Sequence, residues 1–210
     1  SRILVHSQIY DTFVQRLAAR ADQIKLGDPM EQTTQMGPVI SQAALGRCHQ
    51  FIATARAEGA RQVAGAQALA LTGEFANGYY IRPTIFADVH PDHQLFQDEV
   101  FGPVISITRF ETDEQAVALA NTGDFGLGVS IWSRDIARAH RLSRHIRGGI
   151  IWLNDHHRND PRSVWGGVKD SGFGKENGWD ALRGYLSKKS VVIRTEPGYD
   201  DWFAGSNRYG

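Results

Sequence analysis

Helical and strand-like patterns of apolar residues alternate along most of this chain. Apolar positions that repeat every three or four residues predict helices, whose limits are marked by capping or stop residues. These helices run from Ser7 or Asp11 to Gly27, from Ser41 to Gly59, from Thr112 to Gly123, from Asp135 to Gly148 and from Trp179 to Leu186. Short β-branched or aromatic runs predict strands at 61–64, 79–86, 104–108, 128–132, 150–153 and 189–195. The alternation is typical of an α/β fold built on a mainly parallel sheet flanked by helices.

Two segments do not fit this alternation. The run from Asn154 to Gly178 is irregular and too long for a simple connection, which predicts a functional loop. The stretch before the strand at 104–108 carries an acidic pair, an aromatic residue and Gly-Pro. Its Glu99 and Phe101 would suit a cofactor made of a sugar and a ring, because they can present one charge and one flat apolar face. From residue types alone, a core position for Phe101 and a solvated loop position for Glu99 are the simpler interpretation.

The composition is that of an ordinary globular domain, and it limits the functions to consider. The 210 residues are enough to bury a core, and 41% are hydrophobic and 22% charged. With 23 basic and 23 acidic residues, the net charge gives no reason to expect nucleic acid or an anionic membrane as a partner. No apolar run approaches the roughly 20 residues that a membrane span needs. The one cysteine, Cys48, excludes an internal disulfide and fits a reducing, cytoplasmic compartment.

Three candidate reactive features have better structural explanations. Cys48 falls on the apolar stripe of a predicted helix, where a free cysteine behaves as a small hydrophobic residue. His156 and His157 are adjacent, so their side chains are expected to diverge, and no spacing supplies further zinc ligands. The glycine-rich run from Gly166 to Glu176 lacks the Ser or Thr of a P-loop and the third glycine of a dinucleotide fingerprint. The residues alone therefore lead to an α/β domain with two loops of interest.

Seven short motifs, in order along the chain, resemble those of the aldehyde dehydrogenase superfamily. They are Ser1-Arg2, Leu26 to Pro29 with Met36 to Ile40, Gly78 to Thr84, Glu99 to Val104, Gly126 to Gly128, Trp152 to Asn154 and Gly166 to Gly172. Ser1-Arg2 resembles the end of the family's Cys-x-Ala-x-Ser-Arg signature, and Glu99 to Val104 resembles one of its most recognisable motifs. The resemblance covers roughly residues 1–197 and corresponds to the C-terminal part of the family's fold.

The resemblance implies a reaction and assigns roles to three residues. In the superfamily a cysteine thiolate attacks an aldehyde, hydride passes to NAD or NADP, and a glutamate-activated water hydrolyses the thioester to a carboxylic acid. Glu99 corresponds to the glutamate that hydrogen-bonds the nicotinamide ribose, and Phe101 to the aromatic residue that positions the nicotinamide ring. Trp165 corresponds to a position lining the substrate tunnel. Betaine-aldehyde and aminoaldehyde dehydrogenases are similar in placing Trp there, which favours a cationic aldehyde; an aromatic or aliphatic aldehyde would also contact an indole.

The resemblance also implies that the residues carrying the chemistry lie outside the given sequence. The nucleophilic cysteine is expected four residues before Ser1, with the general-base glutamate and most of the nucleotide-binding domain further upstream. No catalytic residue is therefore expected here, and the chain alone is expected to be inactive. The implied organisation is a catalytic domain over 1–186, an oligomerisation strand over 187–197 that joins homodimers or tetramers, and a polar tail over 198–210. A non-catalytic domain used for binding or assembly is the alternative.

Overall fold

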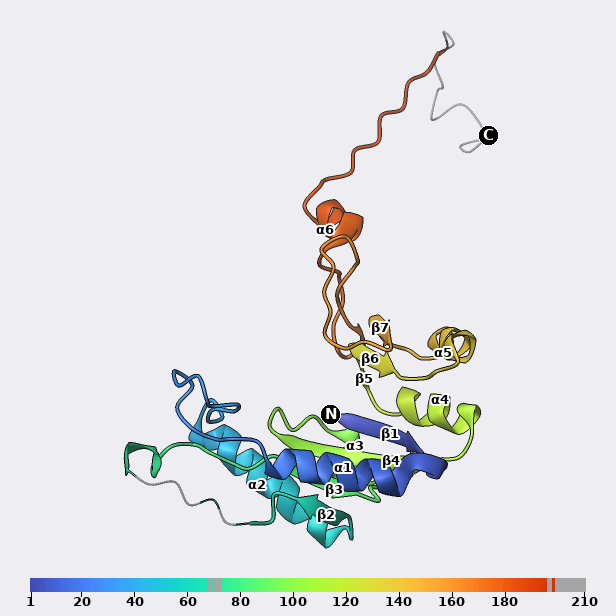
Figure 1. Cartoon of the computed structure of the whole chain (residues 1–210). Coiled ribbons are helices and arrows are strands. Elements are labelled where there is room, and N and C mark those ends of the chain that lie inside the picture. The colour runs from blue at the N-terminus through green and yellow to red at the C-terminus, as the bar shows by residue number, and fades with distance from the viewer. Residues whose placement is uncertain (68, 70–72, 196–197, 199–210) are drawn as a thin grey trace.

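A four-stranded sheet forms the centre of residues 1–110 in the computed structural model, which describes residues 1–67, 69, 73–195 and 198. The strands are β1 (Arg2–His6), β4 (Val104–Phe110), β3 (Thr84–Ala87) and β2 (Arg61–Ala64), in that spatial order (Figure 1). β1 pairs with β4 and β4 with β3 in parallel, whereas β2 pairs antiparallel with β3 at the edge. The mainly parallel sheet predicted from the sequence is therefore confirmed.

Two helices cover opposite faces of this sheet. Successive side chains of a strand point to opposite faces, and on β3 the buried Ile85 and Phe86 belong to different apolar clusters. Ile85 packs with residues of α1 (Tyr10–Asp22), and Phe86 packs with residues of α2 (Gln42–Ala57). A strand that is covered on both faces has no solvated side, which explains why β3 is buried along its whole length.

Three predicted helix starts are confirmed by the hydrogen bonds of their capping residues. In each case a side-chain oxygen accepts from a backbone N–H three residues on, which satisfies a donor that the first turn leaves without a partner. The pairs are Ser41 with Ala44 N–H (3.1 Å) for α2, Thr112 with Gln115 N–H (3.2 Å) for α4 (Asp113–Asn121), and Asp135 with Arg138 N–H (2.9 Å) for α5 (Ile136–Ser143).

The predicted limits of the first helix are wrong at both ends. Ser7 lies in the 3₁₀ turn η1 (Ser7–Ile9), where its hydroxyl donates to the Glu111 carboxylate (2.6 Å), and Ile9 stands at the N-cap of α1 without a side-chain cap. The helix ends at Asp22, before the expected stop at Gly27. The hydroxyl that suggested a cap is therefore used in a contact with a residue far along the chain.

Residues 125–184 form a second, smaller group of elements. β6 (Gly128–Ile131) and β7 (Ile150–Leu153) pair in parallel and are connected through α5. β5 (Phe125–Gly126) pairs antiparallel with β8 (Val168–Lys169). The predicted strands at 128–132 and 150–153 are thus confirmed, and the short helix predicted near 179–186 is α6 (Gly178–Gly184). Figure 1 shows these elements stacked above the sheet, with α4 between the two parts.

The strand predicted over 79–86 is shorter than expected. It begins only at Thr84, after η2 (Gly73–Phe75) and an irregular segment. Pro83 has no N–H to donate to a ladder, and the first ladder-side hydrogen bond comes from Thr84 N–H to Pro103 O (2.8 Å). The buried Tyr80 instead donates its hydroxyl to Gly27 O (3.1 Å), so this aromatic residue joins two loops and is not part of the strand.

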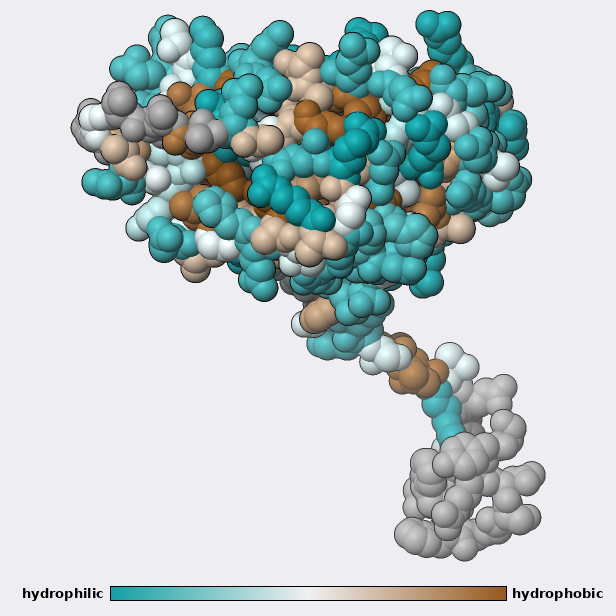
Figure 2. Space-filling view, turned by 90° about the horizontal axis from the view of Figure 1, so that it is seen from below, coloured by the Kyte–Doolittle hydropathy of each residue, from teal (hydrophilic) through white to brown (hydrophobic). Residues whose placement is uncertain are grey.

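The strand predicted over 189–195 is not formed within the described chain. No described segment pairs with it, and Val191, Val192 and Ile193 are 74%, 91% and 77% exposed. Figure 1 shows the chain beyond α6 projecting from the body, and Figure 2 shows apolar surface on the projecting segment. A strand needs a neighbour for its backbone groups, so the alternating pattern alone does not produce one here. Except for Gly198, the predicted polar tail over 198–210 lies outside the described residues.

None of the described helices has the length and apolar character that a membrane crossing would need.

Candidate functional site

The predicted cofactor residues occupy a loop that alternates between solvent and core. The short helix α3 (Gln94–Gln97) ends where the Asp98 N–H donates to Gln94 O (2.9 Å), and the chain then turns toward β4. Val100 is 2% exposed and belongs to the apolar cluster on the α2 face. Glu99 on one side of it is exposed, and Phe101 on the other side is 77% exposed. The interpretation of Phe101 as a core residue is therefore wrong, whereas the solvated position of Glu99 is confirmed.

Close packing and backbone hydrogen bonds hold this loop against the body. Gly102 lies directly on the thiol of Cys48. It lies so close that a Cβ at this position would collide with Cys48 Sγ. Gly102 O accepts from Val104 N–H (2.8 Å), and Pro103 O accepts from Thr84 N–H (2.8 Å), which joins the end of the loop to β4 and β3. The backbone that follows Phe101 is thus held against the body of the domain.

The placement of Cys48 agrees with the prediction of a structural role. It is fully buried on α2, and this burial raises the pKa of its thiol. A thiol in this setting stays protonated near neutral pH, whereas a nucleophilic cysteine requires the thiolate. Cys48 therefore packs behind the loop of Glu99 and does not provide the nucleophile of a reaction.

Glu99 lies within electrostatic range of the first strand. Burial lowers the pKa of the Arg2 guanidinium, and the negative charge of Glu99 opposes that shift. Arg2 also places its guanidinium carbon 4.8 Å from the ring centroid of Phe96, in α3. The motif that resembles the end of the family's cysteine signature and the motif that carries Glu99 are therefore neighbours in space, although about a hundred residues separate them in sequence.

Trp165 belongs to a separate aromatic group. Its ring centroid lies 5.8 Å from that of Trp152, which is 8% exposed and donates its indole N–H to Arg158 O (2.8 Å). His156 and His157 also pack on Trp152, and their own ring centroids are 4.3 Å apart. The prediction that these two side chains diverge is wrong, because His157 adopts a positive φ of 57° that turns its side chain back toward its neighbour.

The glycine-rich run that fails as a phosphate loop instead fixes the backbone of Trp165. Trp165 and Glu176 exchange two backbone hydrogen bonds of 2.7 Å each. The Lys175 ammonium donates to Gly166 O (3.1 Å) and Gly167 O (2.6 Å), immediately after the tryptophan. The run therefore forms a narrow ribbon that presents Trp165, which the glycine spacing alone does not reveal.

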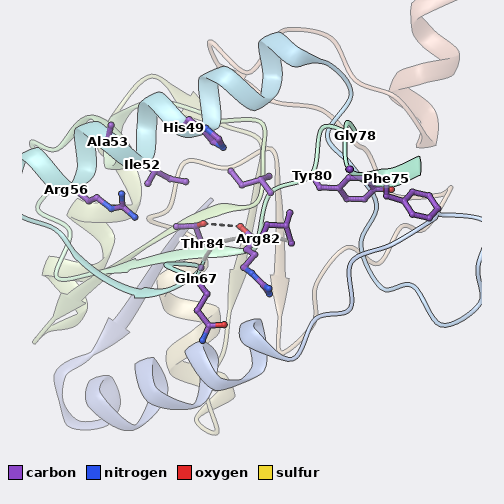
Figure 3. Close-up of a pocket in the computed structure, with 14 residues that line it drawn as sticks. His49, Ile52, Ala53, Arg56, Gln67, Phe75, Gly78, Tyr80, Arg82 and Thr84 are labelled. Carbon is purple, nitrogen blue, oxygen red and sulfur yellow. Dashed lines mark hydrogen bonds between the residues drawn. The ribbon is translucent and has the colours of Figure 1, made fainter. Parts of the chain in front are cut away.

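A cavity of about 450 Å³ lies elsewhere, between α2 and the segment that precedes β3 (Figure 3). His49 and Arg56 line it from α2, and Tyr80 and Arg82 line it from the other side. The Nε of Arg82 is buried without a hydrogen-bond partner among the described residues. None of Glu99, Phe101 and Trp165 contributes to this lining, so the cavity is not the predicted cofactor or substrate site.

Sequence comparison decides the family. The sequence profile of the aldehyde dehydrogenase family matches residues 1–191. The chain belongs to the aldehyde dehydrogenase family. The resemblance inferred from the seven motifs is thus confirmed, and the α/β fold agrees with that of the family's solved structures.

Individual members of the aldehyde dehydrogenase family resemble this chain over almost its whole length. Betaine aldehyde dehydrogenase of Cereibacter sphaeroides is 42% identical over 197 residues, which are 94% of this chain and 40% of that protein. A peroxisomal aminoaldehyde dehydrogenase of Pisum sativum is 37% identical over 203 residues, which are 97% of this chain and 40% of that protein. The structure of betaine aldehyde dehydrogenase from Staphylococcus aureus in complex with NAD⁺ matches with a TM-score of 0.90 and 36% identity, over 98% of this chain and 41% of that one. The chain therefore spans about two fifths of the length of these relatives.

Proposed function

We propose that this chain supplies the nicotinamide-binding part of an NAD(P)-dependent aldehyde dehydrogenase that oxidises an aldehyde to a carboxylic acid. The observation that carries the proposal is the pair Glu99 and Phe101, exposed on a loop that is otherwise packed into the body. A large aromatic side chain that is 77% exposed close to an exposed carboxylate needs an explanation, since apolar rings usually bury most of their surface. A ribose with hydroxyl donors and a flat aromatic ring fit this pair in chemical type.

Glu99 and Phe101 would contact different parts of that cofactor. Glu99 would accept hydrogen bonds from ribose hydroxyls, and Phe101 would limit the positions open to the nicotinamide ring. The cofactor, when bound, supplies the hydride acceptor of the oxidation. The NAD⁺ present in the Staphylococcus aureus structure supports this assignment, since the cofactor predicted from the sequence is NAD or NADP.

The chain by itself is expected not to oxidise aldehydes. Its sequence contains one cysteine, and that cysteine is buried behind the cofactor loop with a raised pKa. A family reaction that begins with thiolate attack therefore has no nucleophile among these residues. Incubating the purified chain with cofactor and betaine aldehyde should give no reduced cofactor; its formation would overturn this expectation.

A hybrid enzyme provides the positive test of the proposal. The part of the Cereibacter sphaeroides betaine aldehyde dehydrogenase that precedes the matched region is fused in front of Ser1, and reduced cofactor is followed by its absorbance. The hybrid is expected to reduce NAD⁺ or NADP⁺ when an aldehyde is added. A folded, soluble hybrid that reduces neither cofactor with any aldehyde, while the parent enzyme does, would refute the proposed function.

The role of Glu99 is tested in the same hybrid with a neighbouring acidic residue as the control. Glu99→Gln should raise the KM for the cofactor about ten- to hundredfold, because a hydrogen bond to a charged group contributes about 1.5–3 kcal/mol. Asp98→Asn removes a charge from the adjacent exposed position, where the carboxylate accepts from the Gln94 side chain (3.1 Å), and should change the KM little. Equal effects of the two substitutions would count against a ribose contact by Glu99.

The proposed substrate is a cationic aldehyde of the betaine or aminoaldehyde type. Trp165 is half-buried in an aromatic group with Trp152, and an indole face attracts an organic cation by roughly 0.5–2 kcal/mol. The names of the two relatives compared above, a betaine aldehyde and an aminoaldehyde dehydrogenase, support the same class. An aromatic or aliphatic aldehyde, held by the same indole through apolar contact, is the competing substrate.

We also propose the domain division and assembly that the resemblance implies. Residues 1–186 belong to the catalytic domain, and the segment 187–197 adds its strand to a partner subunit in a dimer or tetramer. The exposure of Val191, Val192 and Ile193 supports a role in association, because unpaired strands with apolar side chains readily join other sheets. Light scattering on the hybrid should show an oligomer, and replacing these three residues by Ser should shift it toward the monomer.

A cytoplasmic location remains a prediction, and one relative is named as peroxisomal.

A further inference from the structure

One side chain of α2 reaches across to the loop that carries Glu99 and Phe101. The Nε–H of Arg47 donates a hydrogen bond of 2.7 Å to the carbonyl oxygen of Val100. The two residues are 53 positions apart in the sequence, and Val100 itself is 2% exposed. Arg47 is thus a donor to the backbone carbonyl of Val100, the residue that lies between the two predicted cofactor residues.

The peptide that this bond engages controls the direction of Phe101. Phe101 has a φ of +50°, a left-handed backbone conformation that residues other than glycine rarely adopt. Rotating the Val100–Phe101 peptide by half a turn would bring this φ back to a negative value, and it would carry the Val100 carbonyl away from Arg47. The hydrogen bond therefore opposes the rotation that would relieve the strained backbone at Phe101.

The remaining contacts of the loop do not replace this one. Cys48 packs on Gly102, and Thr84 N–H bonds to Pro103 O, so both contacts hold the segment after Phe101. The side chain of Val100 is fixed in the core on the other side. These anchors hold the ends of the turn in place but leave the orientation of the peptide between Val100 and Phe101 open, and the bond from Arg47 acts on that peptide directly.

We propose that Arg47 is a positioning residue of the cofactor site, which fixes the Val100–Phe101 peptide and thereby the direction of Phe101. Arginine suits the task because its guanidinium stays charged and presents rigid N–H donors. The consequence for catalysis rests on the proposed function of Glu99 and Phe101, whereas the consequence for the loop conformation does not. The two consequences are tested separately.

The first test uses the 210-residue chain and does not depend on any activity. Arg47→Met is compared with Arg56→Met by ¹H–¹⁵N NMR of the backbone. Arg56 is a matched control because it lies exposed on the same helix and its Nε bonds to Gln62 Oε1 (2.8 Å) instead of the loop. Arg47→Met should shift and broaden the amide signals of residues 99–102, and Arg56→Met should leave them in place. Unchanged signals at 99–102 in Arg47→Met would overturn the proposal.

The second test uses the hybrid enzyme and separates positioning from stability. Arg47→Met should raise the KM for the cofactor about fivefold, the equivalent of one lost hydrogen bond of about 1 kcal/mol. A merely structural contribution would reduce the fraction of active enzyme and leave the KM unchanged, which would refute the positioning role. Arg56→Met should leave the KM unchanged.

A milder substitution keeps the test decisive if Arg47→Met does not fold. Arg47→Lys retains a charge and a donor but not the planar guanidinium, and it should give signal shifts and a KM between those of the native chain and Arg47→Met. If Arg47→Met does not fold, native signals at residues 99–102 together with a native KM in Arg47→Lys would contradict the proposal. A hybrid with native Arg47 that reduces no cofactor would refute the proposed function of the site, while the NMR comparison would still decide whether Arg47 holds the loop.

Discussion

Gly102 closes the loop of Glu99 and Phe101 against the Cys48 thiol, and this contact leads to a quantitative prediction about stability. Cys48 is fully buried, and a Cβ at Gly102 would overlap its sulfur. Gly102 is not among the glycines with a positive φ, so an alanine there meets no backbone strain of that kind. The substitution Gly102→Ala therefore tests the crowding between the loop and α2 in isolation.

The expected magnitudes follow from packing energetics. An extra methyl group in a packed core costs about 1–3 kcal/mol of unfolding free energy. Cys48→Ala alone removes a buried sulfur and should cost about 1 kcal/mol. In the double variant the obstructing sulfur is gone, so the loss should be about 1–2 kcal/mol smaller than the sum of the two single losses. Gly46→Ala, exposed on α2 with nothing within 4 Å of its new Cβ, is the control and should add about 0.5–1 kcal/mol.

Urea unfolding followed by circular dichroism measures all four variants. The slope of free energy against urea should stay constant across the set, since none of these changes alters the surface exposed on unfolding. Single losses that add within about 0.5 kcal/mol would show that the methyl group and the sulfur do not compete for the same space. A Gly102→Ala variant that is as stable as Gly46→Ala would refute the packing argument altogether.

Three further predictions concern a substrate contact, an ion pair and a helix end. In the hybrid enzyme, Trp165→Ala should raise the KM for a cationic aldehyde more than for a neutral aldehyde of similar size, and equal effects would remove the cation–π argument. Arg138 bonds Asp113 and lowers the pKa of that carboxyl, so the advantage of the native chain over Asp113→Asn in urea unfolding should be about 0.5–1 kcal/mol near neutral pH and should vanish as the pH falls through that lowered pKa. Lys169→Met should lower the free energy of unfolding by about 2–3 kcal/mol, because its ammonium bonds two carbonyls at the end of α4 (2.7 and 2.9 Å), whereas a loss below about 0.5 kcal/mol would mean that water replaces it.

Local sequence signals predicted the elements whose formation is decided locally. Ser41, Thr112 and Asp135 mark helix starts because each side chain bonds to its own first turn. The strand expected over 189–195 is not formed within the described chain, because pairing requires a second segment. The strand expected over 79–86 begins only after Pro83, which has no N–H to donate. Elements that depend on a distant partner are therefore the ones that a single sequence predicts poorly.

At the candidate site, too, the sequence predicts what depends on local residues and misses what depends on distant contacts. The motif from Glu99 to Val104 is recognisable from its residues, but residue types favoured a buried Phe101, and the structure places it in solvent. Which of Val100 and Phe101 enters the core depends on the position of α2, which lies about 50 residues upstream. Arg47 gave no signal at all, because its role is a contact with a carbonyl that sequence patterns do not encode.

The end of α4 connects the two halves of the proposed site. A helix leaves its last carbonyls without intrahelical partners, and their partial negative charge favours cations. Arg2, from the strand beside Glu99, donates to Leu119 O, Ala120 O and Thr122 O. Lys169, which follows the loop of Trp165, donates to Asn121 O and Gly123 O.

In each of these hydrogen bonds the donor comes from one half of the proposed site: Arg2 from the half that contains Glu99, and Lys169 from the half that contains Trp165. The accepting carbonyl belongs to neither half. The loop of Glu99 and the ribbon of Trp165 are thus bound to the same segment, which comprises the last residues of α4 and the two residues that follow it, although they are built on separate sheets. Hydride transfer requires the cofactor ring and the substrate to be held within about 0.5 Å of their productive geometry, so a shared support is what the proposed reaction requires of this chain.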